Sequence, residues 1–318
     1  MADAAVGDDA YGEDPTVNEL QEVFAHRVGK EAALFVPSGT MANQIAIRLF
    51  ASPGSTVLAA RRSHVVSYEN GAAARNTGVQ LHALDDDDGL VAVSAVKWAV
   101  EAGRHHQPVP QLLCLEDTAM AHNGRPWPIE NLRDAAQAGR DGGLPVHLDG
   151  ARLWNAEVAT GVGLAERAAV ADTVMCCLSK GLCAPVGSLL AGSANLMAEA
   201  RRHRHWFGGA MRQSGILAAA GLVGMRTMVE RLAEDHHRAA RLADAVADRW
   251  PESAPSPAVI ETNIVTVRVP HAGAVLEHLA AAGVLAGTLA PGLLRFVTHS
   301  GIDDPGLERA MQAIATAP

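Results

Sequence analysis

The chain has 318 residues, of which 48% are hydrophobic and 19% charged, so it can bury a large core in one large domain with a smaller one beside it. Its formal net charge of −9 argues against nucleic acid as the main partner. The four cysteines form no C-x-x-C pair and mostly lie in apolar runs, which argues against a disulfide framework or a zinc site and favours buried thiols in a reducing compartment.

The sequence predicts neither a signal peptide nor a membrane-spanning segment. The first residues, Met1 to Asp9, are acidic and lack the apolar segment of a signal peptide. The longest apolar stretch, around Ile216 to Met225, is too short and too interrupted by glycine to span a bilayer. We therefore expect a soluble cytoplasmic protein with no membrane partner.

The first predicted element is a helix that starts at Asp14-Pro15-Thr16 and ends at Gly29. Thr16 and Glu19 have the spacing of a capping box, in which the threonine would cap the helix.

A strand over 32–36 follows, and the small-residue turn Pro37-Ser38-Gly39-Thr40 leads from it into a helix over 41–50. A strand, a turn of small residues and a helix leave free backbone N–H groups at the helix N-terminus, where an anion such as phosphate can bind.

Strands then alternate with helices along the chain. The strands are predicted over 56–60, 79–84, 111–115, 145–148, 173–178 and 186–191, and the helices between them over 90–102, 129–140 and 152–158. This alternation is typical of a mostly parallel sheet covered by helices, which is an α/β fold.

Two polar features in this part of the chain suggest metal binding but do not fit it. The run Asp85 to Asp88 before Gly89 has the wrong spacing for a calcium loop, so we expect a solvated turn. The fourteen histidines show no ligand spacing supported by carboxylates, so we predict no metal site and expect most of them to be solvated.

The last third of the chain is mainly helical. Helices are predicted over 195–206 and 212–228, and a third carries Arg231, Asp235 and Arg238. The prolines at 251, 255 and 257 precede two strands, over 263–269 and 293–298, with a helix over 272–282 between them and a last helix after them. We therefore predict a large domain over residues 1–235 and a small C-terminal α+β domain over 236–318.

Three strand ends of the large domain carry groups that belong together chemically. A lone Lys-Gly pair such as Lys180-Gly181 is more typical of a surface turn, but here the lysine follows an apolar strand. Asp149 follows the preceding strand, and Ser38-Gly39-Thr40 follows an earlier one. A pyridoxal 5′-phosphate site needs a lysine for the Schiff base, an acid for the pyridine nitrogen and a helix N-terminus for the phosphate.

Several longer motifs, in order along the chain, resemble those of the L-threonine aldolases. They are Val6-Gly7-Asp8-Asp9, Tyr11-Gly12-Glu13-Asp14-Pro15-Thr16, Ser38-Gly39-Thr40, His64 with Glu69, His147-Leu148-Asp149-Gly150-Ala151-Arg152, Cys177-Leu178-Ser179-Lys180-Gly181, Ala184-Pro185-Val186-Gly187-Ser188, Met211 to Gly221 and Val297-Thr298-His299. The resemblance implies the aspartate-aminotransferase-like fold (PLP fold type I), within the broader group of β-eliminating lyases.

The resemblance also implies residue roles around the cofactor. Lys180 would hold the cofactor as a Schiff base, Asp149 would pair with the pyridinium nitrogen, and Arg152 would lie near the ring hydroxyl. Ser38, Gly39 and Thr40 would hold the phosphate, and His64 would stack on the ring and assist with the proton of the substrate β-hydroxyl.

On the substrate side, the resemblance implies that Arg295, Arg152 and Tyr11 bind the amino-acid substrate. Arg212 and Tyr11 resemble positions that reach a neighbouring subunit's site, with Arg212 on the cofactor side, which implies a homodimer or homotetramer. The implied reaction splits L-threonine, L-allo-threonine and related β-hydroxy-α-amino acids into glycine and an aldehyde.

The chain also departs from the family pattern. The family's upstream strand with Arg-Ser-Asp-Thr has no counterpart in this sequence, and alanine stands at Ala119 where the family has a histidine, so His122 is the predicted replacement. These departures leave two alternatives open: another β-eliminating lyase of the same fold, or a weakly active or inactive relic of it.

Overall fold

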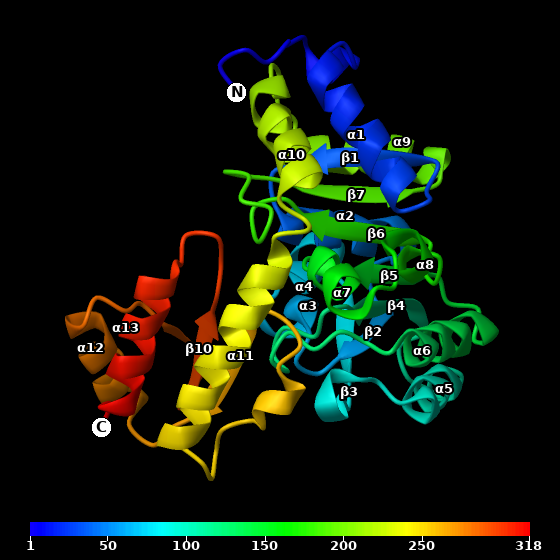
Figure 1. Cartoon of the computed structure of the whole chain (residues 1–318). Coiled ribbons are helices and arrows are strands. Elements are labelled where there is room, and N and C mark those ends of the chain that lie inside the picture. Colours follow the sequence, from blue (N-terminus) through cyan, green and yellow to red (C-terminus); the bar gives the residue numbers. More distant parts are fainter.

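The computed structural model describes residues 1–318 as a large α/β part and a smaller C-terminal part beside it (Figure 1). The large part is built on a seven-stranded sheet with the order β1-β7-β6-β5-β4-β2-β3. Its strands are β1 (Ala32–Val36), β2 (Thr56–Ala60), β3 (Gln80–Leu84), β4 (Pro110–Glu116), β5 (Val146–Asp149), β6 (Thr173–Cys177) and β7 (Ser188–Gly192).

The sheet is mostly parallel, as predicted. Strands β3, β2, β4, β5 and β6 pair in parallel, whereas β7 pairs antiparallel with both β6 and β1. The parallel strands β4, β5 and β6 therefore end at the same edge of the sheet, which brings Glu116, Asp149 and the segment after Cys177 together.

Helices cover both faces of this sheet. Successive residues of β6 point to opposite faces: Met175 packs with α2 and α9, and Cys176 joins the larger core beneath the other face. One face carries α2 (Gly39–Phe50), α3 (His64–Ser67), α4 (Ala72–Thr77) and α9 (Ala194–Trp206). The opposite face carries α1 (Pro15–Arg27), α5 (Val93–Ala102), α6 (Ile129–Asp141), α7 (Leu153–Thr160), α8 (Leu164–Ala168) and α10 (Gly215–Thr227).

The start of α1 differs in detail from the prediction. The N-cap is Asp14, whose Oδ1 accepts the backbone N–H groups of Thr16 and Val17, so the helix begins at Pro15. Thr16 is not the cap: its hydroxyl donates to the carbonyl of Ala5 at 2.6 Å. An Asp-Pro pair supplies both the capping oxygen and the fixed φ of the first turn, which leaves the capping box unused.

The C-terminal part has its own sheet and core. Strands β8 (Ile264–Arg268), β10 (Leu293–Val297) and β9 (Gly287–Ala290) pair antiparallel in that order. Helices α11 (Leu232–Arg249), α12 (Ala272–Ala281) and α13 (Asp304–Ala315) pack on it (yellow to red in Figure 1). Leu232 belongs to the large core and Ala239 to the small one, and the predicted domain boundary after residue 235 falls between them.

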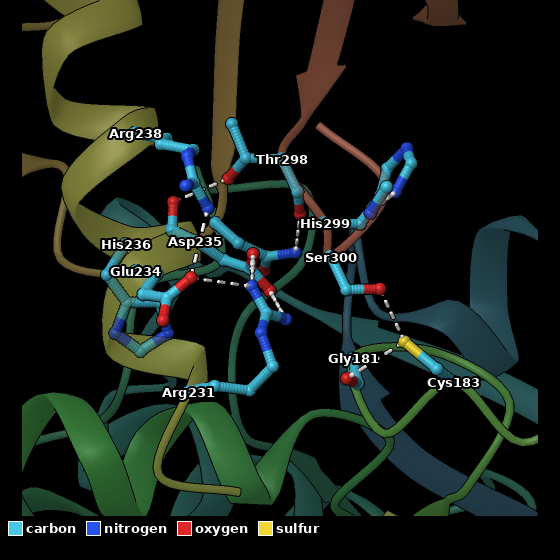
Figure 2. A network of polar contacts seen from close by, with 12 residues as sticks. Gly181, Cys183, Arg231, Glu234, Asp235, His236, Arg238, Thr298, His299 and Ser300 are labelled. Atoms are coloured by element: carbon cyan, nitrogen blue, oxygen red, sulfur yellow. Dashed lines mark hydrogen bonds and ion pairs between the residues drawn. The ribbon is translucent and has the colours of Figure 1, made fainter. Parts of the chain in front are cut away.

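A polar network joins the two parts (Figure 2). Asp235 is fully buried at the start of α11. Its carboxylate accepts hydrogen bonds from both terminal nitrogens of the Arg231 guanidinium, at 2.6 and 3.1 Å. The Thr298 hydroxyl, just after β10, donates to the Asp235 carbonyl at 2.6 Å. Ser300 lies 2.9 Å from the Cys183 sulfur, in the loop that carries Lys180. The C-terminal part is thus tied directly to the lysine loop.

Two polar expectations from the sequence need correction, and a third holds. Asp86 is not solvated: it is buried and accepts the N–H of Arg62. The histidines agree with the expectation that most are solvated: only His147 and His203 are buried, and the other twelve are at least partly exposed. Cys183 is exposed, whereas the other three cysteines are buried. No helix in the chain is long and apolar enough to cross a membrane.

Candidate active site

A cavity of about 160 Å³ lies where the N-terminus of α2 meets the carboxyl ends of β5 and β6. Six of the predicted site residues line it: Ser38, Gly39, Thr40, His64, Asp149 and Lys180. Cavities of about 340 and 620 Å³ on the C-terminal part contain none of the predicted site residues. The structure therefore brings six of the eight predicted cofactor residues together at one edge of the sheet, whereas Arg152 and Arg212 do not line this cavity.

The N-terminus of α2 offers free backbone donors to this cavity. Ser38 is the N-cap: its Oγ accepts the N–H of Met41 at 3.2 Å, and its carbonyl accepts the N–H of Ala42. This leaves the N–H groups of Gly39 and Thr40 without a partner in the protein. A Cβ at Gly39 would lie 2.9 Å from the Cys177 sulfur and 2.9 Å from Met175 Cε, so a larger residue would have to displace these two buried side chains.

Lys180 lies in the loop after β6 and is partly buried. The chain has three lysines, and the other two are placed elsewhere: Lys30 donates to the carbonyl of Ala171, and Lys97 is exposed on α5. The Lys180 carbonyl accepts the N–H of Cys183, and its amine has no hydrogen-bond partner or ion pair in the protein. It is therefore the one amine available in the cavity.

Asp149 is held by two donors, one on each carboxylate oxygen. The backbone N–H of Ala151 donates to Oδ1 at 3.1 Å, and the Asn43 amide donates to Oδ2 at 2.7 Å. Asn43 was missed from the sequence, although it follows Thr40 by one helical turn and therefore faces the same cavity. That spacing was the available signal.

His64 has a raised pKa because of its neighbours. Burial lowers the pKa of the imidazole, but the hydrogen bond from Nδ1 to Glu69 at 2.9 Å and the negative charges of Asp149 and Glu69 outweigh it. Lys180 acts in the opposite direction. The other ring nitrogen, Nε2, has no partner in the protein. His64 can therefore hold or release a proton there.

His64, Glu69 and Asp149 are close enough to suggest a metal ion, since one ligand atom of each lies within 4.8 Å of the others. However, the Asn43 amide already donates to both carboxylates, and His64 Nδ1 is already bonded to Glu69. The arrangement is a hydrogen-bonded network, and the predicted absence of a metal site stays a prediction.

Glu116, at the end of β4, is a buried acid that sequence reasoning passed over. Its carboxylate accepts the backbone N–H groups of His64 and Met120. Burial, together with the charge of Asp149, raises the pKa of Glu116 to about 7. Glu116 thus joins the start of α3, which carries His64, to the loop after β4.

The two predicted substrate arginines lie near each other but do not line the cavity. Burial lowers the pKa of Arg152, and the positive charge of Arg295 adds to the effect. Arg295 comes from β10 of the C-terminal part, with Nη1 3.5 Å from the Met120 sulfur. The C-terminal sheet therefore extends a guanidinium towards the large domain.

Three other predicted residues lie away from the cavity of this chain. His122 faces Asp86, with Nε2 3.2 Å from Oδ2. Tyr11 is 73% exposed, and the Arg212 guanidinium lies 5.7 Å from its ring centre and 2.9 Å from Asp8. These placements do not test the predicted roles of Tyr11 and Arg212, which concern a neighbouring subunit.

Comparison with known proteins finds relatives named threonine aldolases. The chain is 40% identical over 302 residues to the low-specificity L-threonine aldolase of Escherichia coli strain K12, covering 94% of this chain and 88% of the relative. It is 38% identical over 269 residues to low-specificity L-threonine aldolase 1 of Arabidopsis thaliana, covering 83% of this chain and 75% of the relative.

Solved structures show the same fold. A threonine aldolase from Leishmania major superposes with a TM-score of 0.82 at 21% identity, covering 99% of this chain and 92% of that chain. The predicted PLP type I fold is thereby confirmed. The sequence profile of the family described as "Beta-eliminating lyase" matches residues 1–270. On this match and these relatives, the chain belongs to the beta-eliminating lyase family.

Proposed function

We propose that this chain is a pyridoxal phosphate-dependent aldolase that cleaves L-threonine, L-allo-threonine and related β-hydroxy-α-amino acids into glycine and an aldehyde. The observation that carries the proposal is one cavity that combines a lysine amine, an acid at a strand end and two backbone donors, all without the partner that the cofactor would supply. The two relatives described above are named low-specificity L-threonine aldolases, which supports this substrate class.

The residues present fit the cofactor. The N–H groups of Gly39 and Thr40 at the start of α2 would hold its phosphate, because a helix N-terminus favours an anion. Asp149 would pair with the ring nitrogen, and Lys180 would bind the aldehyde carbon. When bound, the cofactor would supply an electron sink for the negative charge that develops on the substrate Cα.

His64 would carry the proton of the substrate β-hydroxyl. Its Nδ1 is held by Glu69, so the ring orientation is fixed and Nε2 is left to exchange a proton. A positioned general base contributes roughly 10²–10⁴-fold to such a step. His122 stays a predicted second carrier, but its Nε2 faces Asp86, so we base the proposal on His64.

Arg295 and Arg152 would hold the substrate carboxylate. A guanidinium presents two parallel N–H donors that match a carboxylate, and the two side chains are near enough for their charges to interact. Because Arg295 belongs to β10, substrate binding would involve the C-terminal part as well as the large domain.

We also propose a homodimer or homotetramer with shared active sites, acting in the cytoplasm. The support for an oligomer is that Tyr11 and Arg212 form an exposed pair outside the cavity of their own chain. The support for a reducing compartment is that all four cysteines are free. Light scattering of the purified protein should give a mass of two or four chains, and a monomer would contradict the proposed oligomer.

The function is tested with the purified wild-type protein and two lysine variants. We expect a visible absorption band with pyridoxal phosphate and release of aldehyde and glycine from L-threonine. Lys180→Ala should abolish both, whereas the control Lys97→Ala, at an exposed lysine of α5, should keep both. Pyruvate and ammonia as products would favour another lyase of the family, and a band without any product would favour a relic.

A further inference from the structure

The side chain of Asn43 is the only neutral group that bridges the two carboxylates of the site. It is 1% exposed, in the second turn of α2. Its amide nitrogen donates to Asp149 Oδ2 at 2.7 Å and to Glu69 Oε1 at 2.8 Å, and its oxygen lies 3.0 Å from His147 Nε2. Both N–H groups of this amide and one lone pair of its oxygen are therefore used in hydrogen bonds.

The direction of these hydrogen bonds is fixed by chemistry. Ionised carboxylates only accept, so the amide nitrogen must face Asp149 and Glu69 and the amide oxygen must face His147. His147 must then donate from Nε2. Burial lowers the pKa of His147 to about 4, so the ring is neutral and Nδ1 accepts from the Thr173 hydroxyl at 2.9 Å. The relay therefore runs from Thr173 through His147 and Asn43 to the two carboxylates.

The relay places both N–H groups of one amide between the carboxylates of Asp149 and Glu69. Two carboxylates this close repel each other, and burial disfavours charge on both. The N–H groups of Asn43 offset this cost because a hydrogen bond to a charged acceptor is stronger than one to a neutral acceptor. The N–H of Ala151 fixes the other oxygen of Asp149, so the carboxylate plane cannot rotate freely.

We propose that Asn43 is a positioning residue that holds Asp149 as an oriented carboxylate against the ring nitrogen of the cofactor, and thereby keeps that nitrogen protonated. The proposal rests on the proposed pyridoxal phosphate site and deepens it. It concerns the ring nitrogen alone: Asn43 has no direct part in holding the phosphate, the aldehyde or the substrate.

The test compares two cofactors in the cofactor-free protein: pyridoxal phosphate and its 1-deaza analogue, in which carbon replaces the ring nitrogen. The dissociation constant of each is measured for wild type, Asn43→Leu and Asn43→Asp. The leucine variant removes the donors, and the aspartate variant keeps the shape of the side chain but replaces the amide with an acceptor. Circular dichroism and urea unfolding check that each variant is folded.

We expect Asn43→Leu to weaken pyridoxal phosphate binding roughly tenfold or more, the size expected for a lost hydrogen bond to a charged group, with little change for the 1-deaza analogue. Asn43→Asp should likewise weaken the binding of pyridoxal phosphate more than the binding of the 1-deaza analogue. The matched control is Gln44→Leu, because Gln44 donates to Glu69 Oε2 at 2.6 Å but makes no hydrogen bond to Asp149. It should leave the ratio of the two dissociation constants unchanged.

Equal losses for both cofactors in the Asn43 variants, or the same change of ratio in Gln44→Leu, would overturn the proposal while leaving the proposed function intact. If Asn43→Leu is unfolded, Asn43→Asp decides by the same ratio. Wild-type protein that binds neither cofactor would overturn both the role of Asn43 and the proposed function.

Discussion

At the scale of single residues, His64 shows how one partner sets a proton affinity. The carboxylate of Glu69 bonds to Nδ1 and raises the pKa of the ring against the effect of burial. The imidazolium form therefore persists to higher pH than in a free histidine, and Nε2 becomes a base only above this raised pKa. The activity of a His64-dependent enzyme should accordingly fall on the acid side of that value.

We predict that Glu69→Gln moves the acid limb of the pH profile of aldehyde release to lower pH. The substitution removes a negative charge beside the ring, so the pKa of His64 falls. Proton NMR titration of His64 in the cofactor-free protein measures the same shift without activity. A titration midpoint that stays at its wild-type value would contradict this assignment.

The buried carboxyl group of Glu116 should make the stability of the fold depend on pH. Its pKa is about 7 when folded and near 4.5 when exposed, so between these values the folded chain binds a proton that the unfolded chain does not. The contribution of Glu116 to stability is fully present below about pH 4.5 and is lost as pH rises through about 7. Glu116→Gln removes this dependence.

Urea unfolding of wild type and Glu116→Gln at pH 5 and pH 8 tests this sign. The free energy of unfolding of the wild type should fall between the two pH values by more than that of the variant. If the free energy of unfolding falls more in the variant than in the wild type, Glu116 is already ionised at low pH in the folded protein.

At the scale of elements, apolar runs and turn residues in the sequence predicted most strands of the large sheet and the start of α2. Strands β1 and β2 have the predicted bounds, because apolar runs flanked by turn residues leave few alternatives. The opposite direction of β7 was not foreseen, since an apolar strand has the same pattern in either direction. The short α3, α4, α8 and β9 were also missed, because four to six residues carry too little periodicity.

Part of the site could also be predicted from the sequence. Ser38, Asp149 and Lys180 were found because each follows a strand, and strand ends meet at one edge. Asn43 and Glu116 were not identified as site residues because their importance lies in bonds that the sequence does not display: the Asn43–Asp149 bond joins residues 106 positions apart. Tertiary hydrogen bonds of this kind depend on the register between elements.

The N-terminus of α2 is closely packed around Gly39. Gly39→Ala should destabilise the fold by about 1–3 kcal/mol, because the added methyl group meets Cys177 and Met175 at 2.9 Å. It should also weaken binding of pyridoxal phosphate, since the free N–H groups move with the helix start. Gly273→Ala in α12 is the control: nothing lies within 4 Å of the added Cβ, and alanine favours the helix. Urea unfolding and cofactor titration measure both variants, and equal effects in the two would contradict the packing argument.

At the scale of the whole molecule, polar contacts join the two parts, among them those of the Thr298 hydroxyl with the Asp235 carbonyl (Figure 2) and of the Thr262 hydroxyl with the Gly124 carbonyl. Asp235 is fully buried, and its partner Arg231 is 17% exposed at the side chain. Because the C-terminal part contributes Arg295, the rigidity of this junction decides how firmly the guanidinium is placed beside Arg152.

Asp235→Ala should cost about 2 kcal/mol of unfolding free energy, because Arg231 loses two hydrogen bonds to a buried carboxylate and keeps only the exposed Glu234, at 3.6 Å, as an ion-pair partner. The control is Glu19→Ala, which removes an exposed ion pair with Arg226 and should change stability by less than about 0.5 kcal/mol. If Asp235→Ala is as stable as Glu19→Ala, the junction does not depend on this pair. Substrate affinity of the folded variants gives a second measurement, and it should weaken only in Asp235→Ala.

The lysine loop adds a practical property to this junction. Cys183 is the only exposed cysteine of the chain, it lies three residues after Lys180, and it contacts Ser300 of the C-terminal part. A thiol-reactive dye should consequently attach at a single position of the unaltered chain. Its fluorescence would follow any movement of the C-terminal part away from the lysine loop, without removal of another cysteine.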